Sequence, residues 1–130
     1  YDLGFRQENA MITRRLALPS VLALSVIGVA APASAHARLV SSTPARDAQV
    51  ASPASMRLTF SERMVPAFST FEVADSQGRA VPVRVTVSED GLTLTGVPGR
   101  RLAAGLHTVT WRIATSDGHR MTGSYTFTVG

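Results

Sequence analysis

The sequence predicts an all-β fold, a Greek-key β-sandwich or barrel of the immunoglobulin-like type with about seven strands. Short runs of alternating apolar and polar residues recur from residue 39 to the C-terminus, and turn-forming residues separate them. This part of the sequence contains no convincing helical period. Alternation of this kind indicates strands with one buried and one solvated face, and two such sheets packed together form a sandwich.

Seven runs carry the pattern. The longest places a valine at every second position of residues 81–87, and the turn sequence Glu89-Asp90-Gly91 follows it. The expected strands are residues 39–40, 56–60, 71–73, 81–87, 92–95, 109–113 and 125–129. The large side chains expected in the core are Phe60, Trp111, Tyr125 and Phe127.

The N-terminal third has the organisation of a secretory signal peptide, at residues 11–35. A start methionine and two arginines precede an apolar segment, and Ala33-Ser34-Ala35 is a small-residue cleavage site. The apolar segment is too short and wrongly flanked for a membrane span. We therefore expect export to the periplasm and a mature domain at residues 36–130 with no membrane span. We interpret residues 1–10 as an extension upstream of the native start.

Composition narrows the function classes. The chain has no cysteine, so it offers neither disulfides nor thiolate ligands. The formal charge is +4, and the arginines of the mature part are scattered, with Arg100-Arg101 as their only adjacent pair. A nucleic-acid-binding surface needs basic residues clustered with aromatic ones, so we do not expect a nucleic-acid partner.

Cleavage after Ala35 would make His36 the first residue, with two nitrogen donors, its α-amine and its imidazole. Asp117 and His119 are separated by one glycine between two predicted strands, which places a carboxylate and an imidazole on one short connection. Nitrogen and oxygen donors without sulfur suit Cu(II). The residues therefore predict a copper site at His36, Asp117 and His119, although an ordinary polar turn would have the same Asp-Gly-His sequence.

The mature chain resembles the CopC family of bacterial periplasmic copper-resistance proteins along nearly its whole length. Four ordered motifs carry the resemblance. They are His36-Ala37-Arg38-Leu39-Val40-Ser41-Ser42-Thr43-Pro44-Ala45, Leu58-Thr59-Phe60-Ser61-Glu62, Leu102-Ala103-Ala104-Gly105 with Val109-Thr110-Trp111-Arg112, and Ser116-Asp117-Gly118-His119 with Thr122-Gly123-Ser124-Tyr125-Thr126-Phe127. In the third motif His107 stands where the family usually has tyrosine.

The resemblance implies a non-enzymatic protein that holds one Cu(II) per chain outside the cytoplasm. It implies the same ligands, His36, Asp117 and His119, with Glu62 close to the copper as a residue that orients a ligand or a water. It also implies a CopD-type inner-membrane copper transporter as partner, and a role in copper buffering, resistance or delivery.

Some members of the family carry a methionine-rich loop for Cu(I), but residues 72–85 here contain neither methionine nor histidine. We expect Met64 and Met121 to be packing or surface residues, and His107 to be a surface or edge histidine. Arg120 follows His119 where a proline is common, which could alter the loop. Two alternatives stay open, a copper monooxygenase with a histidine brace and a metal-free adhesion or interaction sandwich.

Overall fold

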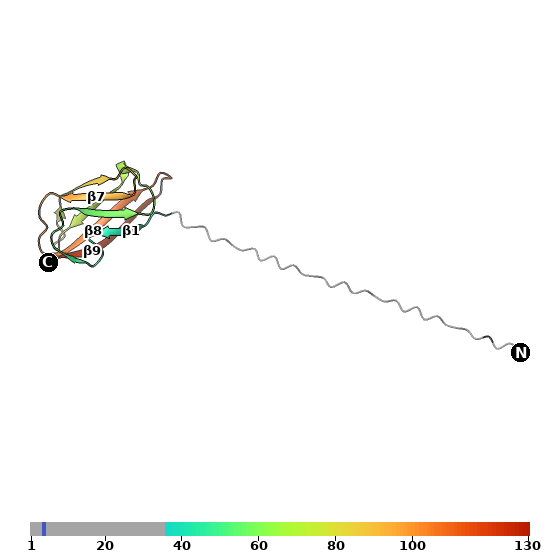
Figure 1. The fold of residues 1–130 in the computed structure, drawn as a ribbon, viewed down its shortest axis with the longest axis horizontal. Coiled ribbons are helices and arrows are strands. Elements are labelled where there is room, and N and C mark those ends of the chain that lie inside the picture. The colour runs from blue at the N-terminus through green and yellow to red at the C-terminus, as the bar shows by residue number, and fades with distance from the viewer. Residues whose placement is uncertain (1–3, 5–35) are drawn as a thin grey trace. The chain divides into compact units, whose positions relative to one another are not determined.

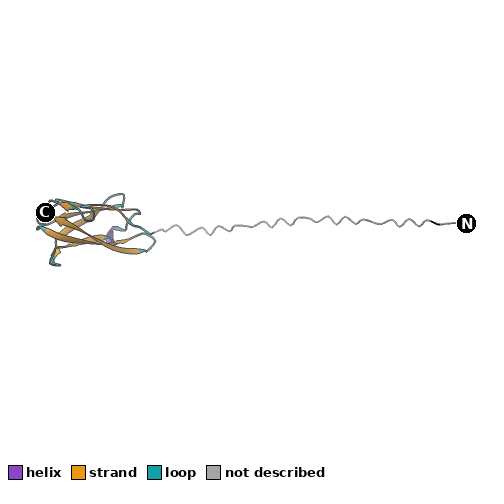
Figure 2. Cartoon of the chain, turned by 90° about the horizontal axis from the view of Figure 1, so that it is seen from below, coloured by secondary structure: helices purple, strands orange, loops and turns teal. Residues whose placement is uncertain are grey.

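The computed structural model describes Gly4 and residues 36–130, and residues 36–130 form two packed β-sheets (Figure 1). The predicted signal peptide and, apart from Gly4, the predicted upstream extension lie outside the described residues. The all-β sandwich is confirmed. Figure 2 shows strands running lengthwise along the domain, with loops gathered at its ends. Among the described residues no helix is long and apolar enough to cross a membrane.

One sheet has four strands and the other has five. The four-stranded sheet has the order β1 (Leu39–Thr43), β3 (Met56–Phe60), β7 (Thr93–Pro98) and β6 (Val83–Val87), and all its pairs are antiparallel. The five-stranded sheet has the order β2 (Gln49–Val50), β9 (Arg120–Val129), β8 (Gly105–Ala114), β4 (Thr70–Ala74) and β5 (Ala80–Val81). A short 3₁₀ turn, η1 (Pro66–Phe68), precedes β4.

The structure corrects one predicted strand. Residues 81–87 are divided at Pro82, so that Val81 pairs with Val73 in the five-stranded sheet and Val83 pairs with Pro98 in the other. Proline has no N–H to donate to a ladder, and it therefore stands where the chain leaves one sheet for the next. This division, together with the two-residue strand β2, brings the strand count of the described residues above the expected seven.

The core lies between the sheets, where the inward side chains of both meet. Phe60, Tyr125 and Phe127 are buried, as the alternation predicts. Trp111 is only partly buried; its ring packs edge-on against Phe60, with 5.1 Å between ring centroids. Met64 is buried and Met121 is partly buried against the core, so both methionines serve packing, as expected.

Candidate metal centre

The predicted site lies at the closed end of the longest hairpin in the five-stranded sheet. β8 and β9 pair continuously from Gly105 opposite Val129 to Ala114 opposite Arg120. Beyond this last pair the chain turns tightly, with the N–H of Thr115 donating to the His119 carbonyl and the N–H of Gly118 donating to the Thr115 carbonyl, both at 3.0 Å. Gly118 has a φ of 88°, a left-handed conformation that favours glycine. The hairpin therefore holds the Asp-Gly-His sequence in a defined turn.

Asp117 is the centre of the hydrogen bonds in this turn. Its Oδ1 accepts bonds from the Thr115 hydroxyl and from the His119 N–H, and its Oδ2 lies 2.7 Å from Nδ1 of His119. The Thr115 hydroxyl, followed by the two His119 groups, lowers the pKa of Asp117 from 3.8 to about 2. The carboxylate is therefore charged at any pH near neutrality.

The same hydrogen bond fixes the orientation of His119. A carboxylate only accepts, so Nδ1 of His119 carries the proton and donates. In the neutral ring this leaves Nε2 with its lone pair, which is the form of imidazole that binds a metal. His119 and Asp117 are both about half exposed, so the donor atoms are open to solvent.

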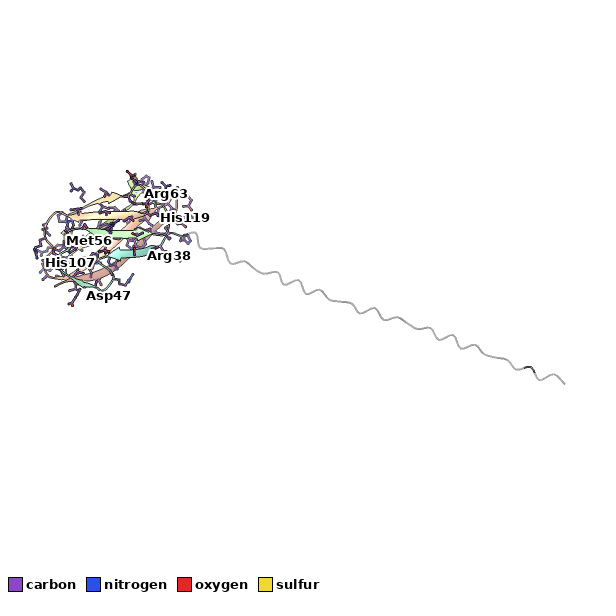
Figure 3. The ribbon with its side chains drawn as sticks, viewed as in Figure 1. Arg38, Asp47, Met56, Arg63, His107 and His119 are labelled. Atoms are coloured by element: carbon purple, nitrogen blue, oxygen red, sulfur yellow. The ribbon has the colours of Figure 1, made fainter. Side chains whose placement is uncertain are left out.

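His36 lies beside this turn although it is far away in the sequence. The ring centroids of His36 and His119 are 5.3 Å apart and their planes are nearly perpendicular, at 87°. The backbone of Arg38 holds the segment in place, because its N–H donates to Oγ of Ser61 and its carbonyl accepts from the N–H of Ser61, both at 3.0 Å. Ala37 is buried between His36 and this clamp. Figure 3 shows Arg38 and His119 at the same end of the domain.

Glu62 directly follows the serine of this clamp and is partly buried. Within residues 36–130 its carboxylate forms no hydrogen bond or ion pair, so its role beside the site stays a prediction. Across the same described range no group of three or more histidine, aspartate or glutamate side chains already has the spacing of a metal centre. Two features of the predicted ligand set account for this. Both oxygens of Asp117 are already in hydrogen bonds, and the α-amine of His36 is not a side chain.

Arg120 keeps the register of the hairpin, since it pairs with Ala114 as the first residue of β9. Its guanidinium lies over the ring of Phe68, 5.4 Å from the centroid, in a cation–π arrangement. Arg120 therefore places a positive charge beside His119 within an intact β8–β9 pairing.

The prediction for His107 was wrong. His107 is only 1% exposed, its ring stacks on Phe127 with 5.4 Å between centroids, and its Nδ1 lies 3.0 Å from the Gly105 carbonyl. It shares the inward face of β8 with Val109 and Ile113, because residues two apart on a strand point the same way. Extending the alternation of Val109 back by one step would have found it. Seven residues of strand, about 23 Å, separate His107 from Ala114 at the loop.

Comparison with known proteins decides the family. The family model that describes the CopC domain matches residues 39–130 of this chain. The chain belongs to the CopC family. It is 36% identical over 126 residues to copper resistance protein C of Pseudomonas syringae pv. tomato, which covers 92% of this chain and 99% of that protein. It is 37% identical over 112 residues to copper resistance protein C of Escherichia coli, covering 80% and 89% of the two chains.

Solved structures of the family share the fold of this CopC chain. The crystal structure of PcoC, a methionine-rich copper resistance protein from Escherichia coli, is 36% identical and has a TM-score of 0.68, covering 74% of this chain and all of that one, 100%. The crystal structure of CopC from Methylosinus trichosporium OB3b is 34% identical with a TM-score of 0.67, covering 72% and 93%. The sandwich and the copper-related family predicted from the sequence are thus confirmed.

Proposed function

We propose that this CopC protein binds one Cu(II) per chain outside the cytoplasm and buffers it or delivers it to a CopD-type membrane importer. The observation that carries the proposal is the approach of His36 to His119, from opposite ends of the domain's sequence, to 5.3 Å between ring centroids. Two imidazoles, a carboxylate and the proposed α-amine form a compact set of nitrogen and oxygen donors. Cu(II) binds such a set more tightly than the other divalent first-row metals do.

The proposed ligands are the α-amine and ring of His36, Nε2 of His119 and an oxygen of Asp117. Nε2 of His119 is free for the metal because Nδ1 donates to Asp117, and an oxygen of Asp117 can join it on the same ion once that hydrogen bond is exchanged for the metal. The amine of His36 becomes free only if the signal peptide is removed after Ala35. The proposal therefore places the site in the exported protein, and the site forms when cleavage occurs. Glu62, next to the Arg38–Ser61 clamp, is proposed to orient a ligand or a water.

The methionines of the mature part support Cu(II) over Cu(I). Met56 and Met64 are buried and Met121 is partly buried against the core, and no pair of exposed thioethers is present in residues 36–130. The Escherichia coli relative is described as methionine rich. Soft sulfur ligands are what Cu(I) needs, so we propose a single copper site here rather than two.

A copper oxygenase would use a similar pair of histidines. If Asp117 binds the metal directly, as proposed, it takes a coordination position that oxygen needs. We therefore propose binding and transfer rather than turnover. Oxidation of a polysaccharide by the copper-loaded protein with a reductant would contradict this proposal.

Native mass spectrometry of the exported protein, with and without added Cu(II), tests the proposal. The expected result is an N-terminus at His36 and a mass increase of one copper ion. His119→Ala should lose the bound copper, whereas His107→Phe, the matched control at the other end of β8, should keep it. A wild-type protein that stays metal-free, or one whose copper survives His119→Ala, would contradict the site.

A further inference from the structure

A second pocket lies at the end of the domain away from the proposed copper site. It has a volume of about 490 Å³, and the β4–β5 turn, β5, the loop before β8 and β8 itself form its walls. Its polar lining consists of Asp75, Arg79, Arg100, Arg101 and His107. Figure 3 shows His107 and His119 at opposite ends of the sandwich, so the two sites are separate.

The charges of this pocket are unbalanced. Asp75 is already neutralised, because Arg79 donates to its Oδ2 from Nε at 3.0 Å and the backbone N–H groups of Gln77 and Arg79 donate to its Oδ1. The backbone N–H of Arg79 is the largest cause that lowers the pKa of Asp75. Arg100 and Arg101 are exposed and have no ion pair within the described part of the chain. Two guanidinium groups at the pocket are therefore without a counter-charge.

His107 also lines this pocket. Its Nδ1 donates to the Gly105 carbonyl, and its Nε2 is buried with no hydrogen-bond partner in residues 36–130. A buried polar atom without a partner is costly, and native proteins keep few of them. The other buried side chains that line the pocket, Val81 and Leu102, are apolar, so the charge available to a ligand comes from the arginines.

We propose that this pocket binds a small tetrahedral oxyanion of the phosphate type. Arg100 and Arg101 hold its oxygens, since Arg79 is already paired with Asp75. The planar guanidinium fork matches phosphate oxygens in geometry as well as charge. The shared chemistry is the phosphoryl group, whether it is a free anion or a lipid headgroup.

Sulfate is the appropriate probe because its charge does not change with pH, so any pH dependence belongs to the protein. Titration of the exported ¹⁵N-labelled protein should give saturable shifts at Arg79, Arg100, Arg101 and His107. The double variant Arg100→Ala/Arg101→Ala should bind about tenfold more weakly or worse, because charge-assisted hydrogen bonds are lost. Arg57→Ala, which removes an exposed arginine outside this pocket, should bind as the wild type does.

The absence of saturable shifts or an equal effect of Arg57→Ala would each overturn the proposal, the second by showing an adventitious ion only.

Vesicles distinguish the two sources of the phosphoryl group. Cosedimentation with phosphatidylglycerol vesicles that is lost in Arg100→Ala/Arg101→Ala would assign a headgroup. Saturable sulfate binding without such cosedimentation would assign a free anion. Both results support the pocket as an oxyanion site.

Discussion

The Thr115 hydroxyl is expected to control the ionisation of Asp117. It donates to Oδ1 of Asp117 and is the largest of the causes that lower the pKa of that carboxyl from 3.8 to about 2. Thr115→Val removes the hydroxyl and keeps the branched shape of a buried side chain. The pKa of Asp117 should rise from about 2 toward 3.8, and it should stop short of 3.8 because both bonds from His119 remain.

The measurement is an acid titration of the Asp117 carboxyl followed by ¹³C NMR in the metal-free protein. Thr108→Val, near the other end of the neighbouring strand β8, is the control and should leave the pKa unchanged. The pKa of Asp117 is lower in the folded protein than in the unfolded chain, so the charged carboxylate stabilises the fold. This stabilisation is fully present above pH 3.8 and is lost as the pH falls through about 2. Thr115→Val should move this loss to higher pH. A pKa that stays near 2 in Thr115→Val would refute the reasoning.

Three further predictions concern the site and its support. His119→Ala should weaken Cu(II) binding by about a hundredfold or more, measured by quenching of Trp111 fluorescence. His107→Phe should leave the Cu(II) affinity unchanged. Loss of binding in His107→Phe but not in His119→Ala would show that the wrong histidine is assigned to the metal. Cu(II) should be released below about pH 5, as protons compete for the imidazoles and the amine, and ascorbate at neutral pH should release the metal to a Cu(I) chelator; tight retention of Cu(I) would point to a thioether site at Met64 and Met121. Gly123→Ala would place a Cβ 2.3 Å from Cζ2 of Trp111, and it should lower the free energy of unfolding by about 1–3 kcal/mol in urea; a stability equal to that of the wild type would show that the Trp111 ring moves aside freely.

The sequence predicts most of the fold because alternation reports which face of a strand is buried. Every predicted run overlaps a strand of the structure. Periodicity could not reveal β2 and β5, which have two residues each, or the change of sheet at Pro82, because such features depend on partners elsewhere in the chain. The expectation for His107 failed for a different reason, because the absence of an acidic neighbour in sequence says nothing about burial, whereas its parity with Val109 on β8 does.

The candidate site could be predicted in part. The spacing of Asp117 and His119 indicates a shared turn, and the turn indeed brings them to 2.7 Å. The approach of His36 depends on the Arg38–Ser61 backbone clamp, a tertiary contact that spacing does not encode. The hydrogen bonds that occupy both oxygens of Asp117 were not predicted either, because they depend on side-chain geometry within the loop.

The most direct test of the proposed copper site is the effect of one additional residue before His36. Two forms of the exported domain are compared, one that begins at His36 and one that keeps a single glycine before it, after circular dichroism and thermal unfolding have shown that both fold alike. Cu(II) affinity is measured for each by competition with a chelator of known affinity. The α-amine of the longer form is displaced from the histidine, so its affinity should fall by orders of magnitude. Equal affinities in the two forms would contradict a site built on the amine and ring of His36.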